Sequence, residues 1–205
     1  FIAVLLGGSL IPVQHVERGN IYFGLDWFLL NLFFLALIFV PMERIFPHLK
    51  KQKIFRIGCQ TDLWHFFVSH LLVQMSVLLT LAPARIFFNW AINSNLQQTV
   101  SSQPAWLQFI GILVVADFFE YWIHRFMHTV RHLWPFHAIH HSSQAMDWLA
   151  ASRLHLADIL VVRAVTFVPL YVLGFGDGPI FAYLIFVSFH ANFIHPNVGF
   201  RLSWL

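Results

Sequence analysis

Charged residues are scarce in this 205-residue sequence: only 10% are Asp, Glu, Lys or Arg, whereas 59% are hydrophobic. A soluble domain carries about 25% charged residues, so this chain lacks the polar surface that water requires. Phenylalanine alone accounts for 24 residues. The composition argues against a soluble domain and predicts a protein whose natural solvent is lipid.

Cysteine is almost absent as well, since Cys59 is the only one in the chain. This count excludes a disulfide framework and any cysteine-based metal site. The sequence also lacks a basic surface that is separate from its apolar runs, although the formal net charge is +3. The Arg and Lys residues gather beside apolar runs, so we expect no nucleic-acid partner.

Long apolar runs dominate what is present. Residues 21–40, 63–84 and 104–123 each have about the 20 residues that a transmembrane helix needs. Two shorter apolar pieces, 159–175 and 179–194, are joined by the turn sequence GFGDGP. They predict either two short spans or a re-entrant helical hairpin.

The predicted fold class is an all-α integral membrane protein, with about four transmembrane or re-entrant helices and a cytosolic, helical, His-rich cap. Within a single membrane domain over residues 1–205, we expect three transmembrane helices in 21–123, the His-rich region in 124–158 and the helical hairpin in 159–195. The chain begins at Phe1 without an initiator Met, so we interpret it as a fragment of a longer protein.

Basic residues predict the orientation. The loop after the first run holds Arg44, Lys50, Lys51, Lys53 and Arg56, and the His-rich region adds Arg125, Arg131 and Arg153. By the positive-inside rule, both segments face the cytoplasm. We therefore expect a multi-pass membrane protein with its active site on the cytoplasmic face. Compact loops and the lack of fused domains favour a bacterial inner membrane over an endoplasmic-reticulum-type membrane.

Histidine is concentrated in the stretch HRFMHTVRHLWPFHAIHH, residues 124–141. Two sets share a helix face: His124 with His128 at i, i+4, and His137, His140 and His141 at i, i+3, i+4. Imidazole binds Fe, Zn, Cu and Ni, and five rings exceed what one metal needs, so the spacing predicts two metals. A pH-sensing patch is the alternative. We interpret His132 as a non-ligand because Pro135 follows it closely.

Polar residues at the end of the third run support a metal site. Asp117, Glu120 and Tyr121 lie seven, four and three residues before His124, on the histidine side of the helix. Metal-bound imidazoles usually donate their other N–H to a carboxylate or carbonyl, which is the role predicted for Asp117. Glu120 is predicted either to do the same or to lie simply at the membrane interface.

Further candidates follow downstream. The stretch ASRLHLADI supplies Arg153, His155 and Asp158, and SFHANFIHPN supplies His190, Asn192 and His195. His190 and His195 are predicted as additional metal ligands. His190 is the better candidate, because its helix returns to the side of the membrane on which His124 lies, whereas Pro196 ends the helix beside His195.

The stretches DFFEYWIHRFMH, WPFHAIHHSS and SRLHLAD, in this order, resemble the fatty acid hydroxylase/sterol desaturase superfamily of integral-membrane enzymes. The first two match its HxxxH and HxxHH boxes, and the resemblance runs from about residue 21 to the end. It implies a cytosolic di-iron centre that activates O2 to hydroxylate or desaturate a lipid C–H. It also implies that His124, His128, His137, His140 and His141 are the ligands at the catalytic centre, with His190 of FHAN as a further one.

Two departures from the family pattern stand out. The usual third box, HxxHH, does not appear within the 205 residues, which favours a truncated chain over an incomplete centre. In RLHLAD, Leu156 and Asp158 stand where the family usually has Pro and Glu, which leaves the roles of His155 and Asp158 open.

The expected function is O2-dependent hydroxylation or desaturation of a sterol or fatty acyl lipid by a non-haem di-iron oxidoreductase, with zinc as a substitute metal. A cytochrome b5-, ferredoxin- or reductase-like partner would donate electrons, since no flavin, haem or nucleotide motif is present. The basic loop of residues 50–56 would suit an acidic donor. The alternatives are an alkylglycerol-ether or carotenoid oxygenase of the same family, an inactive relative, and a non-catalytic membrane protein with structural zinc.

Overall fold

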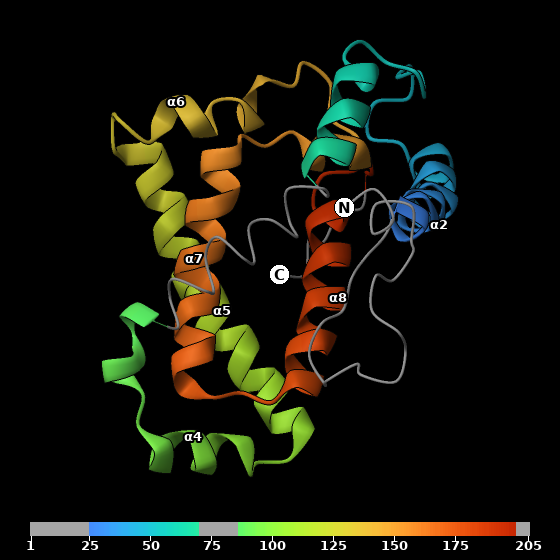
Figure 1. Cartoon of the computed structure of the whole chain (residues 1–205). Coiled ribbons are helices and arrows are strands. Elements are labelled where there is room, and N and C mark those ends of the chain that lie inside the picture. Colours follow the sequence, from blue (N-terminus) through green and yellow to red (C-terminus); the bar gives the residue numbers. More distant parts are fainter. Residues whose placement is uncertain (1–24, 70–85, 200–205) are drawn as a thin grey trace. The chain divides into compact units, whose positions relative to one another are not determined.

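The structure, a computed structural model, describes residues 25–69 and 86–199. Its elements are α2 (Leu25–Ile45), η2 (Asn89–Ala91), α4 (Ser94–Ser101), α5 (Ala105–Thr129), α6 (Trp134–His137), η3 (His140–Ser142), η4 (Trp148–Ser152), α7 (Leu156–Leu173) and α8 (Asp177–Phe193), with further helix at 59–69 (Figure 1). The described ranges contain no strand, only an isolated bridge between Pro47 and Val198. The all-helical prediction is confirmed for these ranges, while much of the predicted span 63–84 lies outside them.

The chain divides into two compact units. The first unit comprises residues 1–56 and 196–205, and Asn197 ties its two segments together. The Asn197 side chain accepts a hydrogen bond from Leu49 N–H at 2.8 Å and donates one to Leu49 O at 3.1 Å. Its backbone N–H donates to Glu43 Oε1 at 3.0 Å.

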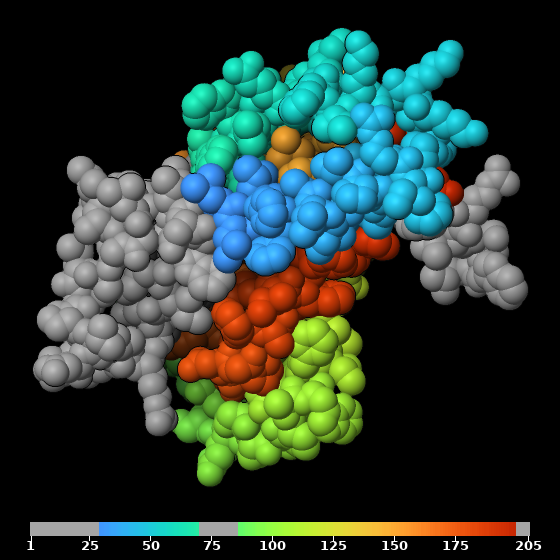
Figure 2. All heavy atoms as spheres, turned by 90° about the vertical axis from the view of Figure 1, so that its right-hand side faces the viewer, coloured from blue at the N-terminus to red at the C-terminus, as the bar shows by residue number. Residues whose placement is uncertain are grey.

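The second unit, residues 57–195, contains three long helices that pack on one another. Helix α5 contacts both α7 and α8, and the buried core between them consists of Ile112, Ala116, Leu170 and Tyr183. Figure 2 shows the beginning of α5, in yellow-green, beside α8, the red segment, and α4 contacts α7. Figure 1 shows α7 and α8 joined at the end of the bundle opposite α6. The other ends of α5 and α7 lie at α6, whereas α8 contacts η4.

A tight turn makes the connection between α7 and α8. Gly174 ends α7 with φ 78°, and its N–H donates to the carbonyls of Leu170 and Tyr171. A Cβ at this position would lie 2.6 Å from the side chain of Gln97, so both the backbone and the space require glycine. The first glycine of GFGDGP thus turns the chain back and forms a helical hairpin.

Two of the described helices, α5 and α7, are long and apolar enough to cross a membrane, with mean hydropathies of 1.4 and 2.0. Large apolar side chains also face outward on the bundle. Val114, Phe118 and Ile185 are 65%, 57% and 59% exposed. Contiguous apolar surface of this kind needs a partner or lipid. These features are consistent with a membrane protein, while the predicted number of spans and the cytosolic cap stay predictions.

Candidate metal centre

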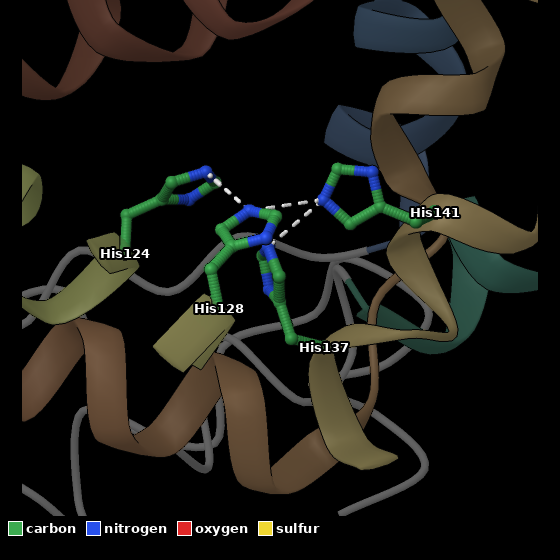
Figure 3. Close-up of side chains that lie close together, drawn as sticks. All are labelled: His124, His128, His137 and His141. Atoms are coloured by element: carbon green, nitrogen blue, oxygen red, sulfur yellow. Dashed lines mark hydrogen bonds between the residues drawn. The ribbon is translucent and has the colours of Figure 1, made fainter. Parts of the chain in front are cut away.

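Four histidines converge at the end of α5. The nitrogens of His124, His128, His137 and His141 that could bind a metal all lie within 4.8 Å of one another. Figure 3 shows the four rings pointing toward a common point, two of them from α5. His128 Nε2 lies 3.0 Å from His124 Nε2 and 3.2 Å from His141 Nε2, and His141 Nε2 lies 3.2 Å from His137 Nε2. We name these four residues the four-histidine cluster.

Local backbone geometry brings the cluster together. His124 and His128 share one face of α5, because they are one turn apart. The helix then ends, and Val130 turns the chain with extended backbone (φ −88°, ψ 115°). Trp134 and Pro135 begin the short α6, with Pro in the first turn where its missing N–H costs nothing. Helix α6 and η3 then place His137 and His141 opposite the α5 pair.

The ring orientation of His137 is set by a carboxylate. His137 is only 3% exposed, and its Nδ1–H donates to Asp158 Oδ2 at 2.9 Å. Asp158 is itself buried in the first turn of α7, where a negative charge is favourable. Because a carboxylate can only accept, the proton of a neutral His137 lies on Nδ1, and the Nε2 lone pair faces the cluster.

A second pair of histidines lies beside the four. His140 Nε2 and His195 Nε2 are 3.4 Å apart, and the His137 and His140 rings have their centroids 5.5 Å apart. His140 Nδ1 donates to the Arg153 carbonyl at 3.2 Å, and His195 Nδ1 donates to the Ala191 carbonyl at 2.6 Å. In neutral rings, both Nε2 atoms are therefore acceptors that face each other. Such a contact needs a proton or a cation between the two nitrogens.

The electrostatics keep these rings neutral. Burial, followed by the neighbouring His195, lowers the pKa of His140 to about 4. Burial also lowers the pKa of His195 from its usual 6.5. For His141, burial and then His137 and His128 lower the pKa. At neutral pH these imidazoles carry lone pairs rather than extra protons, which is the state that binds a metal.

The distances also fit metal ligation. Imidazole nitrogens about 2.1 Å from one metal lie about 3.0–3.4 Å from each other in tetrahedral or octahedral geometry. Three nitrogen–nitrogen distances within the four-histidine cluster, 3.0, 3.2 and 3.2 Å, fall in this range. The residues present therefore fit a transition metal held by the cluster, with His140 and His195 as donors for a neighbouring one.

A buried ion pair supports the loop behind the site. Arg153 Nε donates to Asp62 Oδ1, and Arg153 Nη1 donates to Ser142 Oγ at 3.2 Å. Ser69 Oγ donates to the Ser152 carbonyl at 3.2 Å, next to Arg153. The helix at 59–69 thus holds the segment whose carbonyl orients His140.

Several predicted site residues make other contacts, or none to a histidine, in the described part of the chain. No hydrogen bond links Asp117 or Glu120 to a histidine among the described residues. The Tyr121 hydroxyl accepts from Arg125 at 3.2 Å. His190 stacks on Phe186 at 5.6 Å, so it is His195, the less favoured candidate from sequence, that reaches His140.

Two other predicted residues have local roles in the structure. His155 caps α7, because its Nδ1 accepts from Ala157 N–H at 3.0 Å. The Asn192 side chain donates to the Ser188 carbonyl at 2.7 Å. For all these residues, the predicted contributions to catalysis or metal binding stay predictions.

Sequence reasoning missed two charged residues of this region. Asp62, fully buried, pairs with Arg153, and Arg163 lies within the apolar helix α7. Both are single charges beside or inside apolar runs, and the cost of burying a charge was the signal that could have drawn attention to them.

The fold and the site define a helical protein, consistent with a membrane protein, whose histidine-rich site suits a transition metal. Residues 109–205 match the family model described as fatty acid hydroxylase. This match confirms the family resemblance seen in the histidine boxes.

A curated relative points in the same direction. Over 99 residues the chain is 36% identical to the ornithine lipid hydroxylase OlsE of Rhizobium tropici. The match covers 48% of this chain and 30% of that relative's length. No solved structure matches the chain.

Proposed function

We propose that this protein hydroxylates a C–H bond of a membrane lipid, using O2 at a di-iron centre held by histidine. The observation that carries the proposal is the convergence of four imidazoles within 4.8 Å in a segment that matches the fatty acid hydroxylase family. No side chain can break an unactivated C–H bond, whereas a redox metal with O2 supplies that chemistry.

The chain's own residues would hold and orient the metals. His124, His128, His137 and His141 would hold one iron, and His140 with His195 would contribute to the second. Asp158 and the carbonyls of residues 153 and 191 fix the tautomers of their histidines, which keeps the Nε2 lone pairs aimed at the centre. His190 is also proposed as an iron ligand, and to bind iron its ring would have to move away from Phe186, on which it stacks.

Hydroxylation is proposed over desaturation, because both the family model and the relative carry hydroxylase in their descriptions. The substrate would be a lipid, of the fatty acyl or sterol class or an amino-acid lipid of the kind that the relative's name mentions. Electrons would come from a separate cytochrome b5-, ferredoxin- or reductase-like protein. The basic residues 50–56 are proposed to face that donor and the cytoplasm, in a bacterial inner membrane.

The test uses the full-length protein purified after expression in iron-replete cells. Metal analysis should give two irons per chain, and incubation with O2, a reducing partner and membrane lipids should add one oxygen atom to a lipid, as seen by mass spectrometry. Stoichiometric zinc, with no oxygen consumed on any lipid, would instead favour a structural metal site and contradict the proposal.

A further inference from the structure

Trp134 connects the four-histidine cluster with the surface of the second unit. Its ring stacks on the His141 ring, with centroids 5.8 Å apart and planes inclined by 25°. Its centroid also lies 5.5 Å from that of His128, within the range of about 4.5–7 Å that is typical of ring contacts. Trp134 is nevertheless 41% exposed. One indole therefore reaches from the molecular surface to two of the proposed iron ligands, one on α5 and one on η3.

The turn between α5 and α6 holds this indole in place. The carbonyl of Val130 accepts a hydrogen bond from Trp134 N–H at 3.1 Å, and between these two residues Arg131 and His132 are exposed. Figure 1 shows α6 at the end of the bundle, opposite the connection of α7 and α8. We name residues 130–134 the α5–α6 turn.

The sequence around the turn carries only positive charge. Residues 121–146 contain Arg125 and Arg131 and no Asp or Glu. Both arginines are exposed. A positive surface attracts acidic proteins and speeds their association. Trp and Arg are also the residues that most often dominate the binding free energy at protein interfaces. The turn thus combines an aromatic anchor with charge that suits an acidic partner.

The chemistry proposed for the metal centre identifies that partner. Hydroxylation of a C–H bond with O2 takes two electrons and two protons and forms the alcohol and one water (RH + O2 + 2e− + 2H+ → ROH + H2O). The electrons come from a separate protein, which has to bring its redox group close to the metal ligands. A protein bound on the turn meets this need, because Trp134 is in ring contact with His128 and His141. Electron-transfer encounters bury small interfaces, below about 1,200 Å² in total, which suits a single exposed turn.

We propose that the α5–α6 turn, flanked by Arg125, is the docking surface for an acidic electron-donor protein, and that electrons enter the metal centre beside Trp134. In each transfer the donor's redox group is oxidised by one electron and the centre is reduced by one, so two transfers support one turnover. This inference rests on the proposed function, and it adds the place at which the partner binds. The basic residues 50–56, proposed above to face the donor, lie in the first unit, so variants of both surfaces are compared.

Donor binding is measured with the metal-free full-length protein in lipid nanodiscs by biolayer interferometry. The probes are the soluble haem domain of cytochrome b5 and a plant-type ferredoxin, both acidic, with the basic cytochrome c as control. At least one acidic probe should bind, and more tightly at about 20 mM than at about 200 mM salt, because salt screens the attraction between exposed charges. Cytochrome c should not bind.

Two substitutions with equal changes in net charge separate the two surfaces. Arg131→Glu should raise the Kd of the acidic probe by about tenfold or more, whereas Lys51→Glu in the basic loop should raise it by less than about threefold. Trp134→Leu keeps the charge but removes the aromatic anchor, and it should also raise the Kd by about tenfold. Trp134→Phe should bind the probe more tightly than Trp134→Leu.

Reduction kinetics test the entry of electrons beside Trp134 with the iron-loaded protein. At a saturating concentration of the donor, stopped-flow absorption should show slower reduction of the iron in Trp134→Leu than in the unmodified protein. Reduction by dithionite, a small molecule that needs no docking, should proceed at the same rate in both. A purely structural role of Trp134 would instead change the iron content or both rates equally. Trp134→Phe keeps a ring against His141, so it should recover part of the donor-driven rate.

Three outcomes contradict the proposal. Equal weakening by Arg131→Glu and Lys51→Glu would show that net charge or the basic loop governs binding. Binding of neither acidic probe would remove the docking surface, and binding in detergent but not in nanodiscs would show that lipid covers the turn. If Trp134→Leu loses iron through misfolding, Arg131→Glu decides the question in its place.

Failure of this inference is distinguishable from failure of the proposed function, since binding is measured without metal or turnover. A protein that oxidises no lipid but binds the donor through the turn would contradict the proposed function and leave the docking surface intact. A protein that hydroxylates a lipid, and whose Arg131→Glu and Trp134→Leu variants bind the donor normally, would contradict the docking surface alone.

Discussion

His137 and Asp158 are joined by a buried hydrogen bond of 2.9 Å across 21 positions of sequence. The bond fixes which nitrogen of His137 faces the four-histidine cluster, and it connects α6 to the first turn of α7. A carboxylate in this position also makes the imidazole a stronger electron donor to a metal.

Replacement of this carboxylate should weaken metal binding. We expect Asp158→Asn to lower the affinity for iron or cobalt by about 10- to 100-fold, because the amide loses the negative charge and no longer requires the proton on Nδ1. Titration of the metal-free protein with Co²⁺, followed by absorption, measures the change. Asp177→Asn is the matched control, and equal affinities in the two variants would show that Asp158 has no role in the site.

The two groups of histidines should contribute separately to metal content. His128→Ala removes a member of the four-histidine cluster, and His140→Ala removes a member of the neighbouring pair. We expect His140→Ala to retain about one iron of two, and both variants to lose turnover. Metal analysis of the purified variants checks this, with the exposed His48→Ala as control. If all three variants, including the control, lost similar amounts of metal, the losses would reflect general destabilisation and not the removal of metal ligands.

The metal-free protein should lose stability as the pH falls from 6.5 to about 4. The folded-state pKa of His140 is lowered to about 4 from 6.5, so between these values the unfolded chain binds more protons than the folded one. The free energy of unfolding should therefore fall as the pH drops through this window and level off below it. Thermal melting of the metal-free protein across the window measures this, and His140→Asn should flatten the slope. A melting temperature that rises on acidification would contradict the assignment.

The ion pair between Asp62 and Arg153 should stabilise the loop that orients His140. Asp62→Ala leaves the Arg153 charge buried without its partner, which costs about 3–5 kcal/mol for a pair of this kind. We expect a lower unfolding midpoint in denaturant and reduced metal retention, since the Arg153 carbonyl accepts from His140. The double variant Asp62→Leu/Arg153→Leu should recover part of the stability, because no lone charge then remains. If the loss in free energy of unfolding in the double variant equals the sum of the losses in the two single variants, the two residues are not coupled.

Sequence patterns predicted the features that depend on a single helix. The low charge and the long apolar runs predicted helices suited to a membrane. The i, i+4 spacing of His124 and His128 predicted that both rings lie on one face of a helix. The histidine boxes predicted the family. These inferences succeed because helical periodicity is a local property of the chain.

Tertiary packing decided which faces meet. The sequence favoured His190 and Asp117 near the histidines, but His195 reaches His140, and Asp158 accepts from His137. The partnership of Asp62 with Arg153 across 91 positions was likewise beyond the reach of spacing rules. The rotation and depth of one helix against another depend on how whole surfaces pack, and residue spacing within one helix does not contain that information.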